Sequence, residues 1–458
     1  MTFEIILPLM MIAFGVLFAL VFGGFALISI REGERRAARV AFSIALIGCL
    51  FTLIAAKLPT AALLIIAIVV SAIIAAGIVV FFLPFGKVDM SRDIPNARCD
   101  EREIMFARAR LIPGTGEYEA YYHSHPEHKL IDDRIRAKPG LLSPGSRYYD
   151  RNLFAAPLAS FELTGALQDA MNGEVAGEPI PIDPGQFTFY IKNLGKYFGA
   201  LDVGITELHP YHVYSHIGRG SGIYGNPIPV EHTYAIAFSV EMDYSMVGAN
   251  PTAPGVMESA RQYVEAAKVG VQLASVIRQL GYEARAHIDG NYRVIAPLVA
   301  RDAGLGEIGR MGLLMTPRQG PRVRLGVVTT NLPLTTDPRT RDTAIIDFCS
   351  ICKKCALACP SKSIPFEGRQ EVDGAMRWKI DAESCFHYWN VVGTDCGRCM
   401  TVCPYSHPDS FSHNIIRWGA WKSGGFRRLV ISMDDLFYGK IPSPRPAPPW
   451  IRAVANDK

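Results

Sequence analysis

The sequence CSICKKCALACP (residues 349–360) places three cysteines at intervals of three residues and a fourth cysteine directly before a proline. A second run, C-x10-C-x2-C-x3-C-P, ends at Pro404 and differs in its longer first gap. Ferredoxins with two [4Fe-4S] clusters use this spacing, and the fourth cysteine of each run binds the cluster of the other run. Structural zinc sites use paired C-x2-C units instead, so the pattern favours iron–sulfur clusters over zinc.

Eight cysteines are therefore assigned to two clusters. Three closely spaced thiols surround one cluster, and the cysteine after them starts a helix that points back at the neighbouring cluster. The first cluster is expected to use Cys349, Cys352, Cys355 and Cys403, and the second Cys385, Cys396, Cys399 and Cys359. Clusters that exchange ligands in this way lie close together and form an electron path, which needs a redox centre at its far end. Such uneven placement of cysteine also argues against a disulfide framework.

The composition suggests more than one environment. The chain has 458 residues, enough for more than one folded unit. Hydrophobic residues make up 49%, and the excess lies almost entirely in residues 5–85. The net charge of +4 is small and unclustered, with no basic stripe between aromatic residues. Nucleic acid is therefore not an expected partner.

Three apolar runs, residues 5–30, 40–56 and 60–85, contain no charged residue. A membrane-spanning helix needs about 20 apolar residues, so the runs predict three spanning helices, with the second near the lower limit. The alternative is a buried helical hairpin behind a signal peptide. A signal peptide has an early basic region, whereas this N-terminus has Glu4 and no early Lys or Arg.

The loops between the apolar runs differ in charge. The first connection carries four arginines against two glutamates, the second carries only Lys57, and basic residues follow the third run. Because positive loops stay in the cytoplasm, everything after Gly86 is predicted to be inside. We therefore expect a multi-pass protein of the cell (inner) membrane, in contact with membrane lipid, whose catalytic domain faces the cytoplasm.

The remaining sequence predicts an α/β or α+β unit. Residues 87–186 are rich in Pro, Gly and Arg and are predicted as a loop-rich arm. A helix ending near Gly199, a strand at 234–244, a long helix at 257–280 and strands at 283–288 and 324–334 then alternate around a central sheet. The predicted domains are an anchor at 1–86, the arm at 87–186, a core at 187–337, the double-cluster module at 338–412 and a tail at 413–458 that packs on the core.

Several further stretches are distinctive: LGKYFGALDVGI (194–205), EMDY (241–244), IRQLGYEARA (277–286) and the long run at 303–334 that begins AGLGEIGRMG. With the two cysteine motifs they cover about half the chain, and in this order they resemble the cobalamin-dependent reductive dehalogenases. The resemblance implies an N-terminal α-helical membrane anchor, an α+β corrinoid-binding core with a nitroreductase-like sheet, and a ferredoxin-like double [4Fe-4S] module. It also implies base-off cobalamin, reduced to Co(I) through the clusters, that cleaves a carbon–halogen bond.

The resemblance also implies a proton donor. In the family this is a tyrosine at the end of a core strand with an Arg or Lys partner; Tyr244 matches the tyrosine and Arg310 the cation. A nearby cation lowers the pKa of a buried phenol and stabilises its phenolate. A core tyrosine and a salt-bridging arginine are the ordinary alternatives. Where some members have a third polar residue, an asparagine, this chain offers Gln272 or Ser275.

The motif Gly304-x-Gly306-x-x-Gly309 spells a dinucleotide fingerprint in the wrong context. It follows a helix, and arginines stand where the fingerprint needs an acidic residue. The glycines are instead expected to let the backbone approach the corrin. The expected cofactor-binding residues are Gly304, Gly306, Gly309, Ser275, Thr329, Thr330 and Asn331.

The function expected from the sequence is that of a membrane-anchored reductive dehalogenase acting on an organohalide. Because no flavin module follows the clusters, electrons are expected from an external donor, a ferredoxin- or flavodoxin-type protein or a membrane redox protein. One alternative is an epoxyqueuosine-reductase-like enzyme, which would be soluble and carry a basic surface for tRNA. Another is a non-catalytic membrane ferredoxin, which would not need the core at 187–337.

Overall fold

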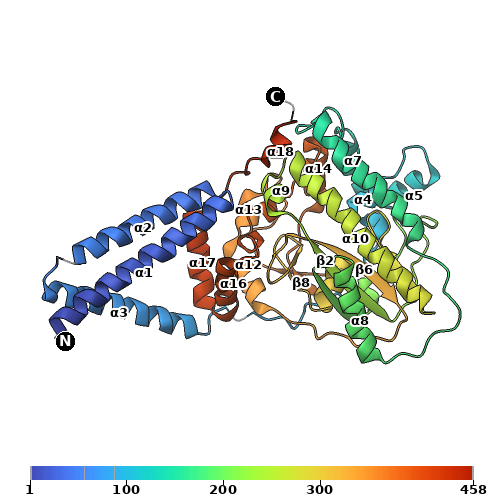
Figure 1. The fold of residues 1–458 in the computed structure, drawn as a ribbon. Coiled ribbons are helices and arrows are strands. Elements are labelled where there is room, and N and C mark those ends of the chain that lie inside the picture. Colours follow the sequence, from blue (N-terminus) through green and yellow to red (C-terminus); the bar gives the residue numbers. More distant parts are fainter. Residues whose placement is uncertain (1–2, 56, 87, 456–458) are drawn as a thin grey trace. The chain divides into compact units, whose positions relative to one another are not determined.

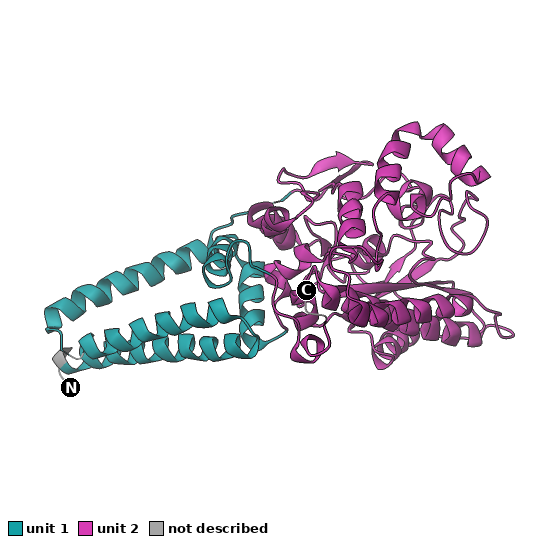
Figure 2. Ribbon diagram, turned by 90° about the horizontal axis from the view of Figure 1, so that it is seen from above, with its two compact units in different colours: residues 1–88, 409–443 teal, residues 89–408, 444–458 magenta. Residues whose placement is uncertain are grey.

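The chain folds into two compact units. The computed structural model describes residues 3–55, 57–86 and 88–455; Ala56, at the end of the second predicted span, and Lys87, one of the basic residues after the third, lie outside them. Unit 1 contains residues 1–88 and 409–443, and unit 2 contains residues 89–408 and 444–458 (Figure 2). The chain therefore leaves unit 1, forms most of unit 2, and then returns to unit 1.

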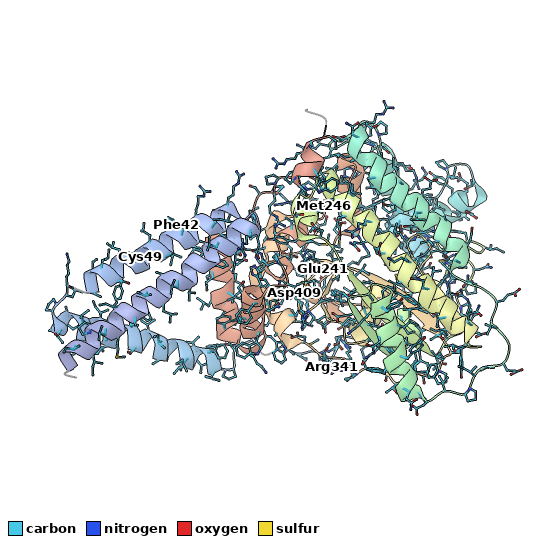
Figure 3. All side chains as sticks on the ribbon, viewed as in Figure 1. Phe42, Cys49, Glu241, Met246, Arg341 and Asp409 are labelled. Atoms are coloured by element: carbon cyan, nitrogen blue, oxygen red, sulfur yellow. The ribbon has the colours of Figure 1, made fainter. Side chains whose placement is uncertain are left out.

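Three long helices of unit 1 coincide with the three predicted apolar runs: α1 (Phe3–Arg31), α2 (Arg35–Ala55) and α3 (Thr60–Phe82) (Figure 1). All three are long and apolar enough to cross a membrane. Phe42 and Cys49 project outward from α2 (Figure 3). Gly48 lets α2 approach α1 closely, because a Cβ there would stand 2.9 Å from the Phe18 ring. Small residues commonly bring membrane helices together in this way.

Two helices from the C-terminal part of the chain complete unit 1. They are α16 (Phe411–Lys422) and α17 (Gly424–Phe437). Phe437 packs on Phe22 and Phe25, with ring centroids 6.4 and 5.1 Å apart. This differs from the prediction that residues 413–458 pack on the core: residues 409–443 group with the apolar helices, and residues 444–458, with α18 (Pro449–Arg452), group with unit 2.

Unit 2 is built on a four-stranded sheet in the order β1-β2-β6-β3, in which every neighbouring pair is antiparallel. The strands are β1 (Asp202–Glu207), β2 (Tyr234–Glu241), β3 (Ala284–His287) and β6 (Val323–Thr330). The last three lie at the predicted strands. Side chains alternate between the two faces, as a pleated strand requires.

Helices cover both faces of this sheet. Phe238 and Val328 lie in the core beneath α8 (Pro184–Tyr197) and the long helix α10 (Ala253–Gln279). Ala237 and Val327 lie in a second core with α11 (Ala296–Asp302). A short hairpin, β4 (Glu307–Ile308) and β5 (Leu314–Met315), follows α11. The unit is therefore α+β, with both faces of its sheet buried.

The arm at 87–186 is more helical than predicted. It contains α4 (Met105–Arg108), α5 (Gly116–Ser124), α6 (Pro126–Arg136) and α7 (Arg151–Ala166). Asp150 caps α7 by accepting from the backbone of Asn152 and Leu153, whereas Pro157 inside the helix hides its periodicity. Helix α7 packs along α10, where Phe161 lies 5.9 Å from the Tyr263 ring.

The cysteine motifs lie on short helices: α12 (Thr343–Cys352), α13 (Lys354–Ala358), α14 (Ala382–Val392) and α15 (Arg398–Thr401). A hairpin of β7 (Gln370–Val372) and β8 (Ala375–Arg377) separates the two motifs. Helix α14 fills the ten-residue gap after Cys385 and ends at Gly393, whose φ of 82° turns the chain back. The longer gap therefore holds a helix and leaves the motif intact.

Candidate active site and cluster module

The eight cysteine thiols fall into two neighbouring groups. Burial raises the pKa of Cys403, and Cys349, Cys352 and Cys355 raise it further. Burial likewise raises the pKa of Cys399, and the thiols of its own predicted set, together with Cys355 of the other set, add to the rise. These mutual influences match the predicted ligand sets, in which each fourth cysteine crosses to the other motif. The thiol donors therefore fit two adjacent iron–sulfur clusters.

Tight backbone turns bring these thiols inward. Lys353, between the second and third cysteines, has a φ of 57°, and Cys396 and Gly397 have φ values of 57° and 62°. Left-handed conformations of this kind bend the chain sharply. Thiolates are the metal-binding form of cysteine. Burial disfavours these thiolates in the protein alone, so a bound cationic centre would stabilise them.

Arg310 belongs to the cluster module. Its Nε donates to the carbonyl of Cys349 at 2.9 Å, and Nη1 donates to the carbonyls of Pro365 and Glu367, each at 2.7 Å. The guanidinium also lies 4.9 Å from the centre of the Trp378 ring. Arg310 therefore holds the first cysteine loop in place, and the structure does not bring it to Tyr244.

Tyr244 begins the short helix α9 (Tyr244–Gly248), directly after the capping residue Asp243. Its ring is covered by Arg445, whose Cζ lies 3.5 Å from the ring centroid. Its hydroxyl oxygen stands 3.4 Å from Nδ1 of His407. Tyr244 thus has a cationic neighbour, but the cation comes from residues 444–458.

A second tyrosine–arginine pair lies between α10 and β6. Tyr263 is on α10, and Arg324 is on the face of β6 that also presents Val328 to α10. Arg324 Nη1 donates to the Tyr263 hydroxyl oxygen at 3.1 Å, and the guanidinium carbon lies 3.9 Å from the ring centroid. The other amino group donates to Ser259. A charged residue on an otherwise apolar sheet face needs such partners.

Three more polar residues surround this pair. Asp289 and Tyr292 follow β3, and Asp395 directly precedes Cys396 and hydrogen-bonds Ser259. Burial raises the pKa of Tyr263 to about 12, against the opposing effect of Arg324. Burial also raises the pKa of Asp289, Tyr292 and Asp395. All of these side chains keep some accessible surface, so they are enclosed by protein without being fully covered.

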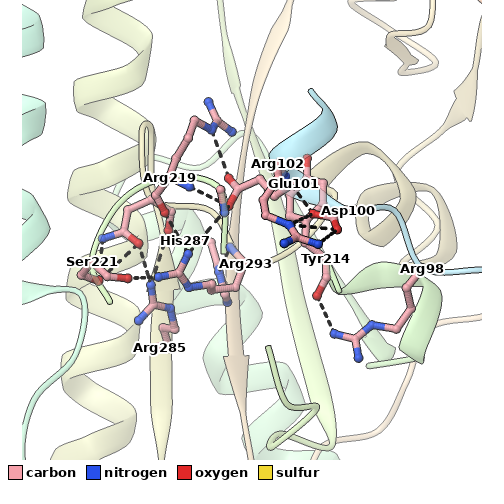
Figure 4. Close-up of polar contacts among 12 residues, drawn as sticks. Arg98, Asp100, Glu101, Arg102, Tyr214, Arg219, Ser221, Arg285, His287 and Arg293 are labelled. Atoms are coloured by element: carbon pink, nitrogen blue, oxygen red, sulfur yellow. Dashed lines mark hydrogen bonds and ion pairs between the residues drawn. The ribbon is translucent and has the colours of Figure 1, made fainter. Parts of the chain in front are cut away.

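The glycine-rich loop at 218–225 is fixed beside this cluster by a buried carboxylate. Glu101 accepts from the backbone nitrogens of Gly218 and Arg219 at 2.9 and 3.1 Å and from Arg219 Nε at 3.0 Å (Figure 4). Arg293 Nη1 lies 3.8 Å from the same carboxylate. Arg219 in turn affects the pKa of Asp289 and Tyr292. The arm therefore positions a second arginine at the edge of the site.

Glu101→Ala is expected to lower the free energy of unfolding of unit 2 by about 3–5 kcal/mol, because it leaves buried cations without their partner. The loss can be measured from the midpoint of thermal unfolding, followed by circular dichroism. Glu103→Ala is the matched control, since Glu103 is exposed two residues away. Equal stability of the two variants would contradict the role assigned to Glu101.

The expected cofactor-binding residues lie apart from the Tyr263 pair. Thr329 Oγ1 stands 2.7 Å from Nδ1 of His232 and 2.9 Å from Nε2 of His287. Thr330 and Asn331 hydrogen-bond Glu283, and Ser275 lies further along α10. The three glycines pack against protein: a Cβ would meet Pro338 at Gly304, Met315 at Gly306, and Met315 and Cys349 at Gly309. Their small size therefore serves packing within the described residues.

Comparisons with known proteins agree with the cluster module and extend beyond it. Residues 348–407 match the 4Fe-4S dicluster domain. The chain is 31% identical over 296 residues to a tetrachloroethene reductive dehalogenase of Sulfurospirillum multivorans, covering 57% of this chain and 58% of the relative. It is 34% identical over 193 residues to a tetrachloroethene reductive dehalogenase of Desulfitobacterium hafniense, covering 40% of this chain and 34% of that relative.

A solved structure of the catabolic reductive dehalogenase NpRdhA superposes with a TM-score of 0.63 at 26% identity, covering 77% of this chain and 49% of that chain. A shorter match, 33% identical over 118 residues, joins 25% of this chain to 30% of an epoxyqueuosine reductase of Listeria monocytogenes. The chain spans less than two thirds of the length of these relatives. The longer matches place the chain in the reductive dehalogenase family.

Proposed function

We propose that this protein reductively removes a halogen from an organohalide, with Tyr263 as the proton donor. The observation that carries the proposal is the 3.1 Å hydrogen bond between Arg324 and the Tyr263 hydroxyl, in a polar cluster that includes Asp395. Asp395 directly precedes Cys396, a predicted cluster ligand. A proton source and an electron source thus meet in one enclosed region.

Electron and proton balance defines what the residues must do. Replacing halogen by hydrogen consumes two electrons and one proton and releases a halide ion. The phenol of Tyr263 keeps its proton at neutral pH, because burial raises its pKa to about 12. When the proton leaves, Arg324 stabilises the phenolate through its existing hydrogen bond.

The residues around Tyr263 fit a corrinoid in two respects. They are polar and enclosed yet partly accessible, and Arg324 Nε is buried without a hydrogen-bond partner among the described residues. A bound base-off cobalamin would supply the low-potential chemistry that breaks the carbon–halogen bond. The loop at 218–225 and the turn from Asp289 to Tyr292 would hold it, on a sheet of the nitroreductase-like type.

Electrons would enter through the cysteine module. The ligand set that contains Cys396 would be nearer to Tyr263, and the set that contains Cys403 would receive electrons first. An external one-electron donor at the cytoplasmic side of the membrane would supply them, consistent with the basic loop at 31–39. The helices α1, α2 and α3 would keep the enzyme at the lipid surface.

A metal assay followed by turnover tests this function. Protein purified without oxygen should contain cobalt and iron, and should release halide from halophenols or haloalkenes with reduced viologen as donor. Iron and sulfide without cobalt, and no halide release, would instead indicate a membrane ferredoxin. Reduction of epoxyqueuosine in tRNA without dehalogenation would support the other alternative.

A further inference from the structure

Unit 1 contains a groove between α2 and α17. Its volume is about 360 Å³, and it is lined by Arg36, Arg39, Val40, Ser43 and Ile44 of α2 and by Leu436 of α17. The two arginines lie one helical turn apart, so their side chains project from the same side of α2. The groove therefore combines two cations with a mainly apolar wall.

Both guanidinium groups keep free donors. Arg36 Nε donates to the Leu436 carbonyl at 3.3 Å, and Arg39 Nε donates to the Arg35 carbonyl at 3.4 Å. Within the described part of the chain, neither guanidinium forms an ion pair with a carboxylate. A guanidinium has five N–H donors, so each arginine can still bind an anionic oxygen.

The same end of unit 1 has the features of a membrane–water boundary. Helix α16 exposes Phe411, Ile415 and Trp418 at helical spacing, with exposed fractions of 81%, 47% and 57%. The Trp418 ring lies 6.4 Å from Phe81, near the end of α3. Exposed tryptophan and apolar side chains on a surface helix are typical of helices that lie among lipid headgroups. The arginines of the groove begin α2 at this boundary.

We propose that this groove binds an anionic phospholipid, with its phosphate on Arg36 and Arg39 and an acyl chain along Val40 and Ile44. Charge complementarity selects an anionic headgroup, and the apolar wall selects a ligand with a hydrocarbon tail. Inorganic phosphate satisfies only the first requirement, and a neutral quinone leaves both cations unmatched. The inference concerns unit 1 alone and does not depend on the proposed dehalogenation.

Native mass spectrometry of the full-length protein in detergent tests this site, with phosphatidylglycerol and phosphatidylcholine as probes. We expect selective retention of phosphatidylglycerol, and a loss of about 10- to 30-fold in its affinity in the variant Arg36→Gln/Arg39→Gln. Arg35→Gln is the matched control, since Arg35 is exposed at the start of the same helix but does not line the groove.

Two further arms keep the test decisive. Because Arg36 also holds Leu436, the single variant Arg39→Gln should show a smaller loss of several-fold with normal helix content. Inorganic phosphate should not displace the lipid. Equal retention of phosphatidylcholine, displacement by phosphate, or unchanged binding in both variants would overturn the proposal.

Discussion

Tyr263→Phe is expected to reduce halide release by about 10²- to 10⁴-fold, because it removes the only proton of the phenol and leaves the ring in place. The side chain keeps its contact with Phe161, so cobalt and iron contents should not change. The measurement is the rate of halide release with reduced viologen, at a fixed cobalt content.

Tyr244→Phe is the matched control for this variant. Tyr244 also has a cationic neighbour, Arg445, but stands apart from the Tyr263–Arg324 pair. Near wild-type turnover in Tyr244→Phe, with loss in Tyr263→Phe, is the expected pattern. The reverse pattern would return the proton donor to the position suggested by family resemblance.

The pH dependence provides an independent check. Burial raises the pKa of Tyr263 to about 12, so the phenol stays protonated from neutral to moderately alkaline pH. Turnover should therefore show no decline from ionisation of Tyr263 until strongly alkaline pH. A decline centred near neutral pH that disappears in Tyr263→Phe would contradict this assignment.

Removing Cys403 is expected to abolish the cluster of the first cysteine motif and to lower turnover by more than about 100-fold, because electrons then lose their path. Iron should fall from about eight to about four atoms per chain. Cys403→Ala should therefore give the same electron paramagnetic resonance spectrum as Cys352→Ala, its partner in the predicted ligand set.

The second pair of variants makes this test specific. Cys359→Ala should match Cys399→Ala, and the two pairs should differ from each other. If each motif bound its own cluster, Cys403→Ala would instead resemble Cys399→Ala. The comparison needs no assignment of individual signals, since only the grouping of spectra is used.

The features predicted from the sequence are those set by short-range spacing. The cysteine intervals define the double-cluster module, and three uninterrupted apolar runs define α1, α2 and α3. The strand at 234–244 and the long helix at 257–280 also have clear periodicity, and the structure contains β2 and α10 there. Each depends on neighbours along the chain.

The pairing of Tyr263 with Arg324 depends on how α10 and β6 pack, which no local pattern reveals. A usable signal was nevertheless present. Arg324 has the same strand parity as Val328, which faces α10, so a charged residue was aimed into a helix–sheet interface. Tyr263 lies on the helix that covers this face. Arg310 drew attention through its glycine-rich motif, yet its partners are carbonyls of the cluster loops.

The arm and the tail were mispredicted for different reasons. In the arm, Pro157 obscured a helix whose start was already marked by Asp150. In the tail, the aromatic residues were correctly read as packing residues, but aromatic side chains do not specify a partner. Phe437 packs on Phe22 and Phe25, more than 400 positions earlier in the chain.

The return of residues 409–443 to unit 1 has a consequence for biosynthesis. A ribosome that adds 5–20 residues per second needs roughly 15 to 60 s to make the intervening segment, Asp89–Pro408. During that interval α1, α2 and α3 can enter the bilayer, but the surfaces later covered by α16 and α17 stay open. Completion of the anchor is thus a late event, and chains truncated before residue 409 should reach the membrane with those surfaces exposed to quality-control proteases.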